Sequence, residues 1–260
     1  MIGSHPGGIA LTRRLLELAG VELPDKDTIK IYGVDRGGKL PGTERDPLIS
    51  GYPEKVRSVS EFAENQYLIS GFTEYNPSVK ILDLGAGTGE TVSYLRKLGY
   101  DAFGIEQNVK LLFQASVAKK ITVGDMTALS FPDESFDLCM AECSISVCGD
   151  GPAALKEAYR VLRPGGSLLL SDVCFSKENA PCLSMSGPVT KTLWEQECVR
   201  AGFVIRAWKD ETPLWREFFL ESLWNDNADE AFCDFFRDAG KAGCGYFLAW
   251  LLKGGRDGFI

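Results

Sequence analysis

Apolar positions along the middle of the chain alternate between strand-like runs and helix-like spacings. The short, β-rich run Val79–Leu84 is followed by apolar residues at helical spacing within Thr88–Leu98. The same pair of patterns then recurs, so that predicted strands and predicted helices alternate. We expect further strands at Tyr100–Glu106, Ile121–Asp125, Ser135–Ala141, Ser167–Val173, Phe203–Trp208 and Gly245–Leu252. This rhythm predicts βαβ units, and hence a doubly wound α/β fold with a mostly parallel, seven-stranded sheet covered by helices on both faces.

Further helices are expected between these strands, at Val109–Lys119, Pro152–Leu162, Thr190–Ala201 and the aromatic-rich stretch Leu214–Phe236. Arg163–Gly166 reads Arg-Pro-Gly-Gly and predicts a turn, because proline stops a helix and glycine frees the backbone.

The N-terminal part is less regular. A helix is expected at Ile9–Ala19, followed by a stretch rich in Pro, Gly and charge that holds one more helix near Val56–Ile69. We therefore predict two regions: a helical extension and insertion over residues 1–78, which is a candidate lid, and the main α/β domain over residues 79–260.

Composition narrows the class of protein. The chain of 260 residues is 45% hydrophobic with a net charge of −8, which is typical of a globular protein and disfavours nonspecific binding to nucleic acid. No apolar run is long enough for a membrane helix, and the N-terminus lacks the order of a signal peptide. Eight cysteines without a CxxC pair predict reduced thiols in a cytoplasmic protein, and no metal site is expected.

The sharpest signal is the loop Asp83–Glu90, which reads Asp-Leu-Gly-Ala-Gly-Thr-Gly-Glu between a predicted strand and a predicted helix. Glycines at this position let a ligand approach the backbone and the free N–H groups of the helix. A dinucleotide loop needs the order G-x-G-x-x-G, but Glu90 stands where the third glycine would be. Asp83 would also repel a pyrophosphate, whereas a cofactor with a positively charged amino group would favour acidic residues here.

This loop resembles motif I of the class I S-adenosylmethionine-dependent methyltransferases, which have a Rossmann-like fold. Four further segments of the chain resemble that family's motifs, in the same order: Glu106, Gly124–Met126, Phe131–Asp137 and Arg160–Gly166. The resemblance covers about residues 79–175, and it is nearest to the ubiquinone-biosynthesis and arsenite-methyltransferase-like branch. It implies S-adenosylmethionine as the cofactor and a small molecule as the methyl acceptor, whereas it leaves the oligomeric state open.

The resemblance also implies roles for individual residues. Glu106 would hold the two ribose hydroxyls, Asp125 would accept from the adenine amino group, and Met126 would pack on the ring. Asp83 would guide the cofactor, although it could instead cap the following helix. The full set of expected cofactor residues is Asp83, Gly85, Ala86, Gly87, Gly89, Glu106, Gln107, Asp125, Met126 and Glu142.

No catalytic residue is assigned from the sequence, because methyl transfer needs a base only where the acceptor must lose a proton. The candidates are Glu142, His5 and Cys143. Cys143, Cys148, Cys174 and Cys182 all fall at or after strand ends. They would line a thiol pocket of the arsenite-methyltransferase type, or they are small buried hydrophobes, as Cys139 is expected to be.

Two other functions stay open. One is a regulatory protein that binds S-adenosylmethionine without turnover. The intact set of acids at Asp83, Glu106 and Asp125 favours the enzyme over this alternative. The other is an NAD-dependent oxidoreductase, which the glycine spacing disfavours.

Overall fold

The computed structural model describes residues 6–21, 23, 79–112, 120–176, 190–224 and 230–254, with the backbone alone for Ala231 and Phe232. The helix expected near Val56–Ile69 lies outside these residues, as do His5 and Cys182. The division of the chain between residues 78 and 79 therefore stays a prediction.

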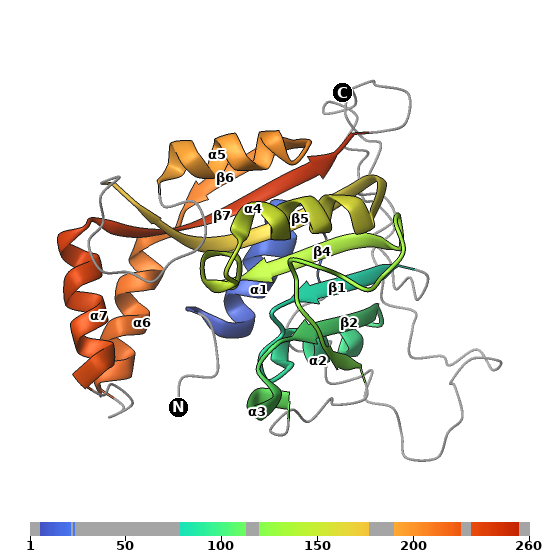
Figure 1. Ribbon diagram of the computed structural model, residues 1–260. Helices are drawn as coiled ribbons and strands as arrows, with labels where there is room; N and C mark the ends of the chain where they lie inside the picture. Colours follow the sequence, from blue (N-terminus) through green and yellow to red (C-terminus); the bar gives the residue numbers. More distant parts are fainter. Residues whose placement is uncertain are drawn as a thin grey trace, which may run out of the picture.

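Within the described residues, seven strands form one sheet in the order β3-β2-β1-β4-β5-β7-β6 (Figure 1). Their bounds are β1 (Lys80–Leu84), β2 (Asp101–Glu106), β3 (Ile121–Val123), β4 (Phe136–Glu142), β5 (Leu162–Phe175), β6 (Phe203–Asp210) and β7 (Cys244–Lys253). The first five strands are parallel, and β7 runs antiparallel between β5 and β6. The doubly wound, mostly parallel α/β fold is thus confirmed. The strand order reverses between β1 and β4, which is where such sheets open a crevice for ligands.

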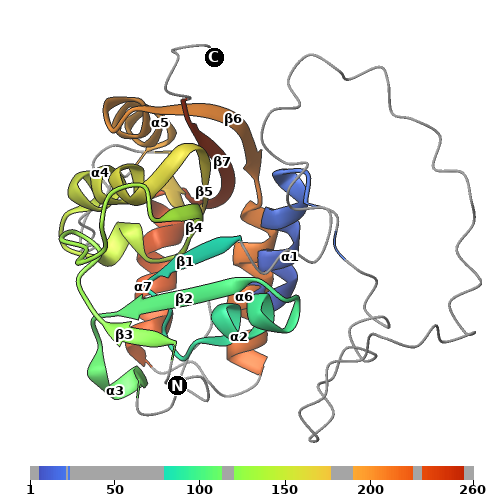
Figure 2. The same cartoon turned by 90° about the vertical axis from the view of Figure 1, so that its right-hand side faces the viewer.

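Helices cover both faces of this sheet (Figure 2). One face carries α1 (Gly8–Leu18), α2 (Glu90–Lys97), α6 (Thr212–Trp224) and α7 (Glu230–Lys241), and the other carries α4 (Gly151–Val161) and α5 (Lys191–Arg200). Two shorter elements are α3 (Val109–Leu112) and the 3-10 turn η3 (Ile145–Val147).

Successive strand residues face opposite cores, as the pleat of a strand requires. In β1, Ile81 packs with α1 and α2, whereas Leu82 and Leu84 pack with the α4 and α5 side. In β4, Met140 belongs to the first core and Ala141 to the second. By this alternation, Asp83 and Glu142 point to the face that α1 and α2 cover.

Local sequence explains where several helices begin. Asp150 accepts a hydrogen bond from the N–H of Ala153 and so caps α4, and Thr190 caps α5 in the same way through Leu193. On α1 the buried residues Leu11, Thr12, Leu15 and Leu16 form one face, which packs onto the sheet and onto α2.

Two expectations about the elements need correction, and a third is tested only in part. The predicted turn at Arg163–Gly166 lies inside β5, because pairing with β4 continues on both sides of it and shifts register there. The predicted helix Leu214–Phe236 is two helices, α6 and α7. Of the helix predicted over Val109–Lys119, the structure shows Val109–Leu112, and residues 113–119 lie outside the described part.

Candidate ligand site at the carboxyl edge of the sheet

The glycine loop joins β1 to α2 in the conformation that its glycines predict. Gly85, Gly87 and Gly89 have φ angles of 80°, 53° and 82°, a region that side chains disfavour. At Gly85 space is also decisive, because an added Cβ would lie 2.6 Å from the Cβ of Ser144. The loop therefore brings its backbone against the end of β4, which a bulkier residue would prevent.

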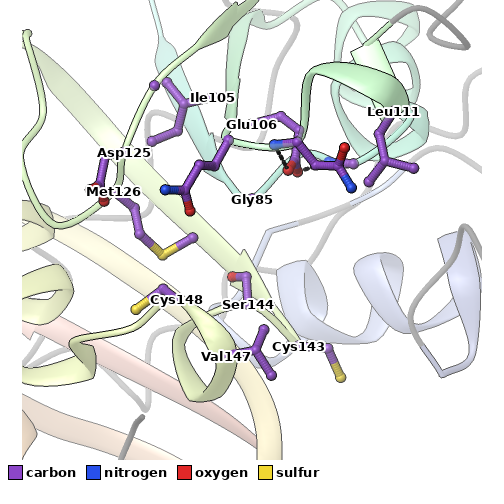
Figure 3. A pocket seen from close by; sticks show the side chains of 14 residues that line it. Gly85, Ile105, Glu106, Leu111, Asp125, Met126, Cys143, Ser144, Val147 and Cys148 are labelled. Atoms are coloured by element: carbon purple, nitrogen blue, oxygen red, sulfur yellow. Dashed lines mark hydrogen bonds between the residues drawn. The ribbon is translucent and has the colours of Figure 1, made fainter. Parts of the chain in front are cut away.

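A cavity of about 420 Å³ opens between this loop and the segment that follows β4 (Figure 3). That volume suits a small molecule or a cofactor. We call its first side the glycine-loop wall, made by Gly85, Gly87, Ile105, Glu106, Gln107, Asn108, Leu111, Gly124, Asp125 and Met126. We call its second side the 143–148 wall, made by Cys143, Ser144, Val147 and Cys148.

The structure brings together most of the residues expected to bind a cofactor. Those on the cavity wall are Gly85, Gly87, Glu106, Gln107, Asp125 and Met126. The remaining four, Asp83, Ala86, Gly89 and Glu142, do not line it. Asp83 and Glu142 are the last or near-last residues of the adjacent strands β1 and β4, so they lie behind the wall at the same sheet edge.

Glu106, at the end of β2, is held by the backbone. Its Oε2 accepts a hydrogen bond of 2.8 Å from the N–H of Gly87, and its Oε1 accepts one of 2.7 Å from the N–H of Asn108. A carboxylate oxygen accepts more than one hydrogen bond, so both oxygens keep capacity for a ligand. The two backbone contacts thus fix a carboxylate on the cavity wall.

Asp125 and Met126 follow β3 on the same wall. Asp125 Oδ1 accepts from both the N–H and the hydroxyl of Thr127, at 2.8 and 2.7 Å, so this residue does form the local turn. Met126 is buried, and its Cε lies 3.2 Å from the position of an added Cβ on Gly85. The thioether thereby forms an apolar patch beside the glycine loop.

Asp83 is 3% exposed. Burial raises its pKa well above the ordinary value, and the nearby carboxylates of Glu142 and Glu106 raise it further. Asp83 does not provide the cap of α2, because Gly89 occupies the N-cap position and that helix has no side-chain cap. The surroundings of Asp83 at the base of the loop therefore disfavour its ionised form unless a cation lies nearby.

Glu142 is also buried, and two threonines bind it. Thr12 of α1 donates to its Oε1 and Oε2 at 3.0 and 3.2 Å, and Thr91 of α2 donates to its Oε2 at 2.9 Å. These contacts come from segments far apart in the sequence, and the sequence alone did not indicate them.

Cys143 stands at a tight bend between β4 and η3. Its φ of 53° is rare for a residue with a side chain, and such strain is common beside ligand sites. Its thiol donates to the hydroxyl of Tyr246 at 3.2 Å. Burial raises the pKa of this thiol well above its usual value, and Asp172 adds to the effect. Cys143 is thus a protonated thiol, which is a poor nucleophile.

Burial also raises the pKa of other thiols near the strand ends. Cys148 donates to the carbonyl of Ile145 at 3.2 Å, and burial raises its pKa. Burial also raises the pKa of Cys174 to about 11, and Cys139 is buried within β4 as expected. No group of three or more metal-binding side chains occurs among the residues that the structure describes.

Ser144, on the 143–148 wall, has a buried hydroxyl group whose hydrogen-bonding capacity is not satisfied. It is 7% exposed, and its Oγ has no hydrogen-bond partner among the residues that the structure describes. A buried hydroxyl without a partner costs roughly 1–3 kcal/mol, so a ligand atom in the cavity is its natural partner. Figure 3 shows Ser144 directed toward the glycine-loop wall.

Sequence reasoning gave no role to five of the lining residues: Ile105, Asn108, Leu111, Ser144 and Val147. Their common signal is position, because each lies at or within a few residues of the carboxyl end of a predicted strand.

Among the described helices, none is long and apolar enough to cross a membrane.

Comparison with known proteins supports this geometry. Residues 82–170 match the family model described as "Methyltransferase domain". This part of the chain is a methyltransferase domain. The matched stretch begins within β1, includes the whole glycine loop and ends within β5, so the family resemblance seen in the motifs is confirmed.

The curated relatives of this chain include an O-methyltransferase and an N-methyltransferase. The malonyl-(acyl-carrier protein) O-methyltransferase of Erwinia billingiae is 38% identical over 134 residues, which are 49% of this chain and 53% of that enzyme. The chain matches about a third to a half of the length of such curated relatives.

Solved structures share the fold. The (4+2)-cyclase SpnF aligns with a TM-score of 0.59 at 23% identity, covering 68% of this chain and 76% of that one. Phosphoethanolamine N-methyltransferase 2 of Haemonchus contortus, solved with S-adenosylmethionine, aligns with a TM-score of 0.54 at 18% identity, covering 68% and 49%.

Proposed function

We propose that this protein is an S-adenosylmethionine-dependent methyltransferase that transfers a methyl group to a small molecule by in-line displacement. The observation that carries the proposal is the cavity itself. It lies at the carboxyl edge of the parallel strands, with the glycine loop and the fixed carboxylate of Glu106 on one wall. The methyltransferase-domain match covers both of these features.

Electrostatics favours a cationic cofactor over a dinucleotide. Asp83 is buried near two other carboxylates, and this raises its pKa. A positively charged ligand would relieve that repulsion, whereas a pyrophosphate would increase it. The amino group and the sulfonium of S-adenosylmethionine supply such charge, so the acids fit this cofactor.

The residues on the glycine-loop wall fit the remaining parts of the cofactor. Glu106 presents two oxygens to two neighbouring ribose hydroxyls, and its backbone contacts hold it in that orientation. Asp125 would accept from the adenine amino group, and Met126 would pack on the base. Ser144 would supply its unused hydroxyl to the part of the cofactor that crosses Gly85.

S-adenosylmethionine supplies a methyl group that its sulfonium already activates, so the protein contributes mainly position and charge. The acceptor would enter past the 143–148 wall, where Val147 is 63% exposed. None of the described candidates acts as a base in this arrangement. Glu142 lies behind the wall, and the thiol of Cys143 is turned toward Tyr246. An acceptor that attacks without first losing a proton suits this site.

The thiol pocket finds no support in this geometry, because Cys143 and Cys148 direct their thiols to different partners. Binding without turnover remains the second candidate. The observation that favours it is that neither Glu142 nor Cys143, the described catalytic candidates, is placed to act as a base.

Calorimetry and a methyl-transfer assay test the proposal in sequence. Titration with S-adenosylmethionine, S-adenosylhomocysteine and NAD should show binding of the first two and none of NAD. Transfer of labelled methyl groups to thiols, quinols, amines or arsenite then separates an enzyme from a binding protein. Binding without transfer to any acceptor would favour the second candidate, and binding of NAD alone would refute both.

A further inference from the structure

The buried face of α1 contains one polar residue among leucines. Thr12 is 0% exposed, as are Leu11 and Leu15 on the same face of the helix. A valine would fill the same space without needing a hydrogen bond. The hydroxyl at this position therefore calls for an explanation beyond packing.

The hydroxyl of Thr12 lies against the carboxylate of Glu142, within 3.0 Å of Oε1 and 3.2 Å of Oε2. Thr91 donates to Oε2 from α2, and the two threonine oxygens are 3.5 Å apart. Hydrogen bonds to a charged acceptor are stronger than neutral ones and restrict its orientation. Two helices thus hold one carboxylate.

Other contacts already fix α1 to the domain. Arg13 donates to the hydroxyl of Tyr94 at 3.0 Å, and Arg14 pairs with Glu211 at 2.7 Å. Together with the leucine face, these contacts dock the helix without Thr12. The Thr12–Glu142 contact is therefore available for a role other than anchoring.

Glu142 lies next to the cavity wall, so the orientation of its carboxylate can affect a ligand in the cavity. It ends β4, and the next two residues, Cys143 and Ser144, line the cavity. It also lies close enough to Asp83 to raise the pKa of that carboxyl. The amino-acid portion of the cofactor is its only part with an ammonium group, and it would lie at this acidic end.

We propose that Thr12 is a positioning residue of the methyl-donor site: it orients the Glu142 carboxylate, which lies behind the cavity wall, so that its negative charge attracts the ammonium group of the cofactor. The N-terminal helix α1 is then part of the binding site. This inference rests on the proposed function, since it concerns how S-adenosylmethionine is held.

The test compares two ligands that differ in the amino-acid portion. S-adenosylhomocysteine carries the ammonium group, and methylthioadenosine lacks that whole portion. We expect Thr12→Val to weaken S-adenosylhomocysteine about tenfold and to leave methylthioadenosine unchanged. Thr12→Ser keeps the hydroxyl and should restore the wild-type affinity. Tyr94→Phe removes another contact between α1 and α2, and it is the control expected to change neither affinity.

The outcomes distinguish a failure of the proposed function from a failure of the role proposed for Thr12. If the wild type binds neither ligand, the proposed function fails. If the wild type binds both ligands and Thr12→Val weakens both equally or neither, Thr12 has no positioning role. Thermal unfolding of each variant shows whether the fold is intact. If Thr12→Val does not fold, Thr12→Ser and Thr91→Val are compared with the same two ligands, and Thr91→Val must then show the selective loss.

Discussion

The two walls of the cavity are built in different ways. On the glycine-loop wall, residues of short motifs hold the polar side chains: Glu106 is bound by its neighbour Asn108 and by Gly87 of the glycine loop, and Asp125 is bound by its neighbour Thr127. On the 143–148 wall, residues of strands that are distant in sequence form the hydrogen bonds. The N–H of Cys143 donates to the carbonyl of Ser171 on β5, and its thiol donates to Tyr246 on β7.

A third contact between residues distant in sequence holds η3 against β5. The N–H of Ser146 donates to Oδ2 of Asp172, a fully buried carboxylate whose pKa burial raises to about 6. The first wall is thus a property of short motifs, and the second is a property of the folded sheet. The predictions below test the proposal that the first wall binds most of the cofactor and that the second wall mainly shapes the space beside it.

The largest effect is expected at the point where the walls meet. Gly85→Ala places a Cβ 2.6 Å from that of Ser144 and forces alanine to adopt a φ of 80°. We expect the affinity for S-adenosylmethionine to fall at least a hundredfold, or about 2.7 kcal/mol, in calorimetry. Adding Ser144→Gly removes the clash but keeps the strained φ, so it should restore affinity only in part. Full affinity in Gly85→Ala alone would show that the walls do not meet at this point.

A smaller effect is expected behind the glycine-loop wall. Asp83→Ala should weaken S-adenosylmethionine at least tenfold, or about 1.4 kcal/mol, because it removes a carboxyl group that ionises when the cofactor cation binds nearby. A bound cation lowers the raised pKa of Asp83, so binding to the wild type should release protons and tighten as the pH rises. Calorimetry in buffers of different ionisation enthalpy measures this release. Equal release from wild type and variant would remove Asp83 from the site.

The smallest effect is expected on the 143–148 wall. Cys143→Ala and Cys148→Ala should each keep turnover within about threefold, because both thiols are protonated and neither is directed at a reacting group. Steady-state kinetics with the acceptor identified by the methyl-transfer assay gives the comparison. A loss of turnover beyond tenfold, with cofactor affinity unchanged, would instead favour the thiol pocket.

The contrast between the walls also explains what the sequence could predict. The sheet follows from alternating strand and helix patterns, because each pattern is local. The glycine loop and the placement of Glu106, Asp125 and Met126 on the wall follow from motifs a few residues long.

What the sequence could not predict depends on tertiary contacts. The contact of Thr12 with Glu142 joins residues 130 positions apart, and no local pattern marks it. The need of Ser144 for a partner arises only when β4 and the glycine loop lie side by side. The turn at Arg163–Gly166 was misjudged because the pairing of β5 with β4 extends past it.

A crystal structure grown with S-adenosylhomocysteine tests the central claim most directly. The account predicts density in the cavity, with the ribose hydroxyls on the Glu106 carboxylate and the amino-acid portion crossing Gly85 toward Glu142. Density for the ligand elsewhere on the protein, with the space between Gly85 and Ser144 vacant, would contradict it.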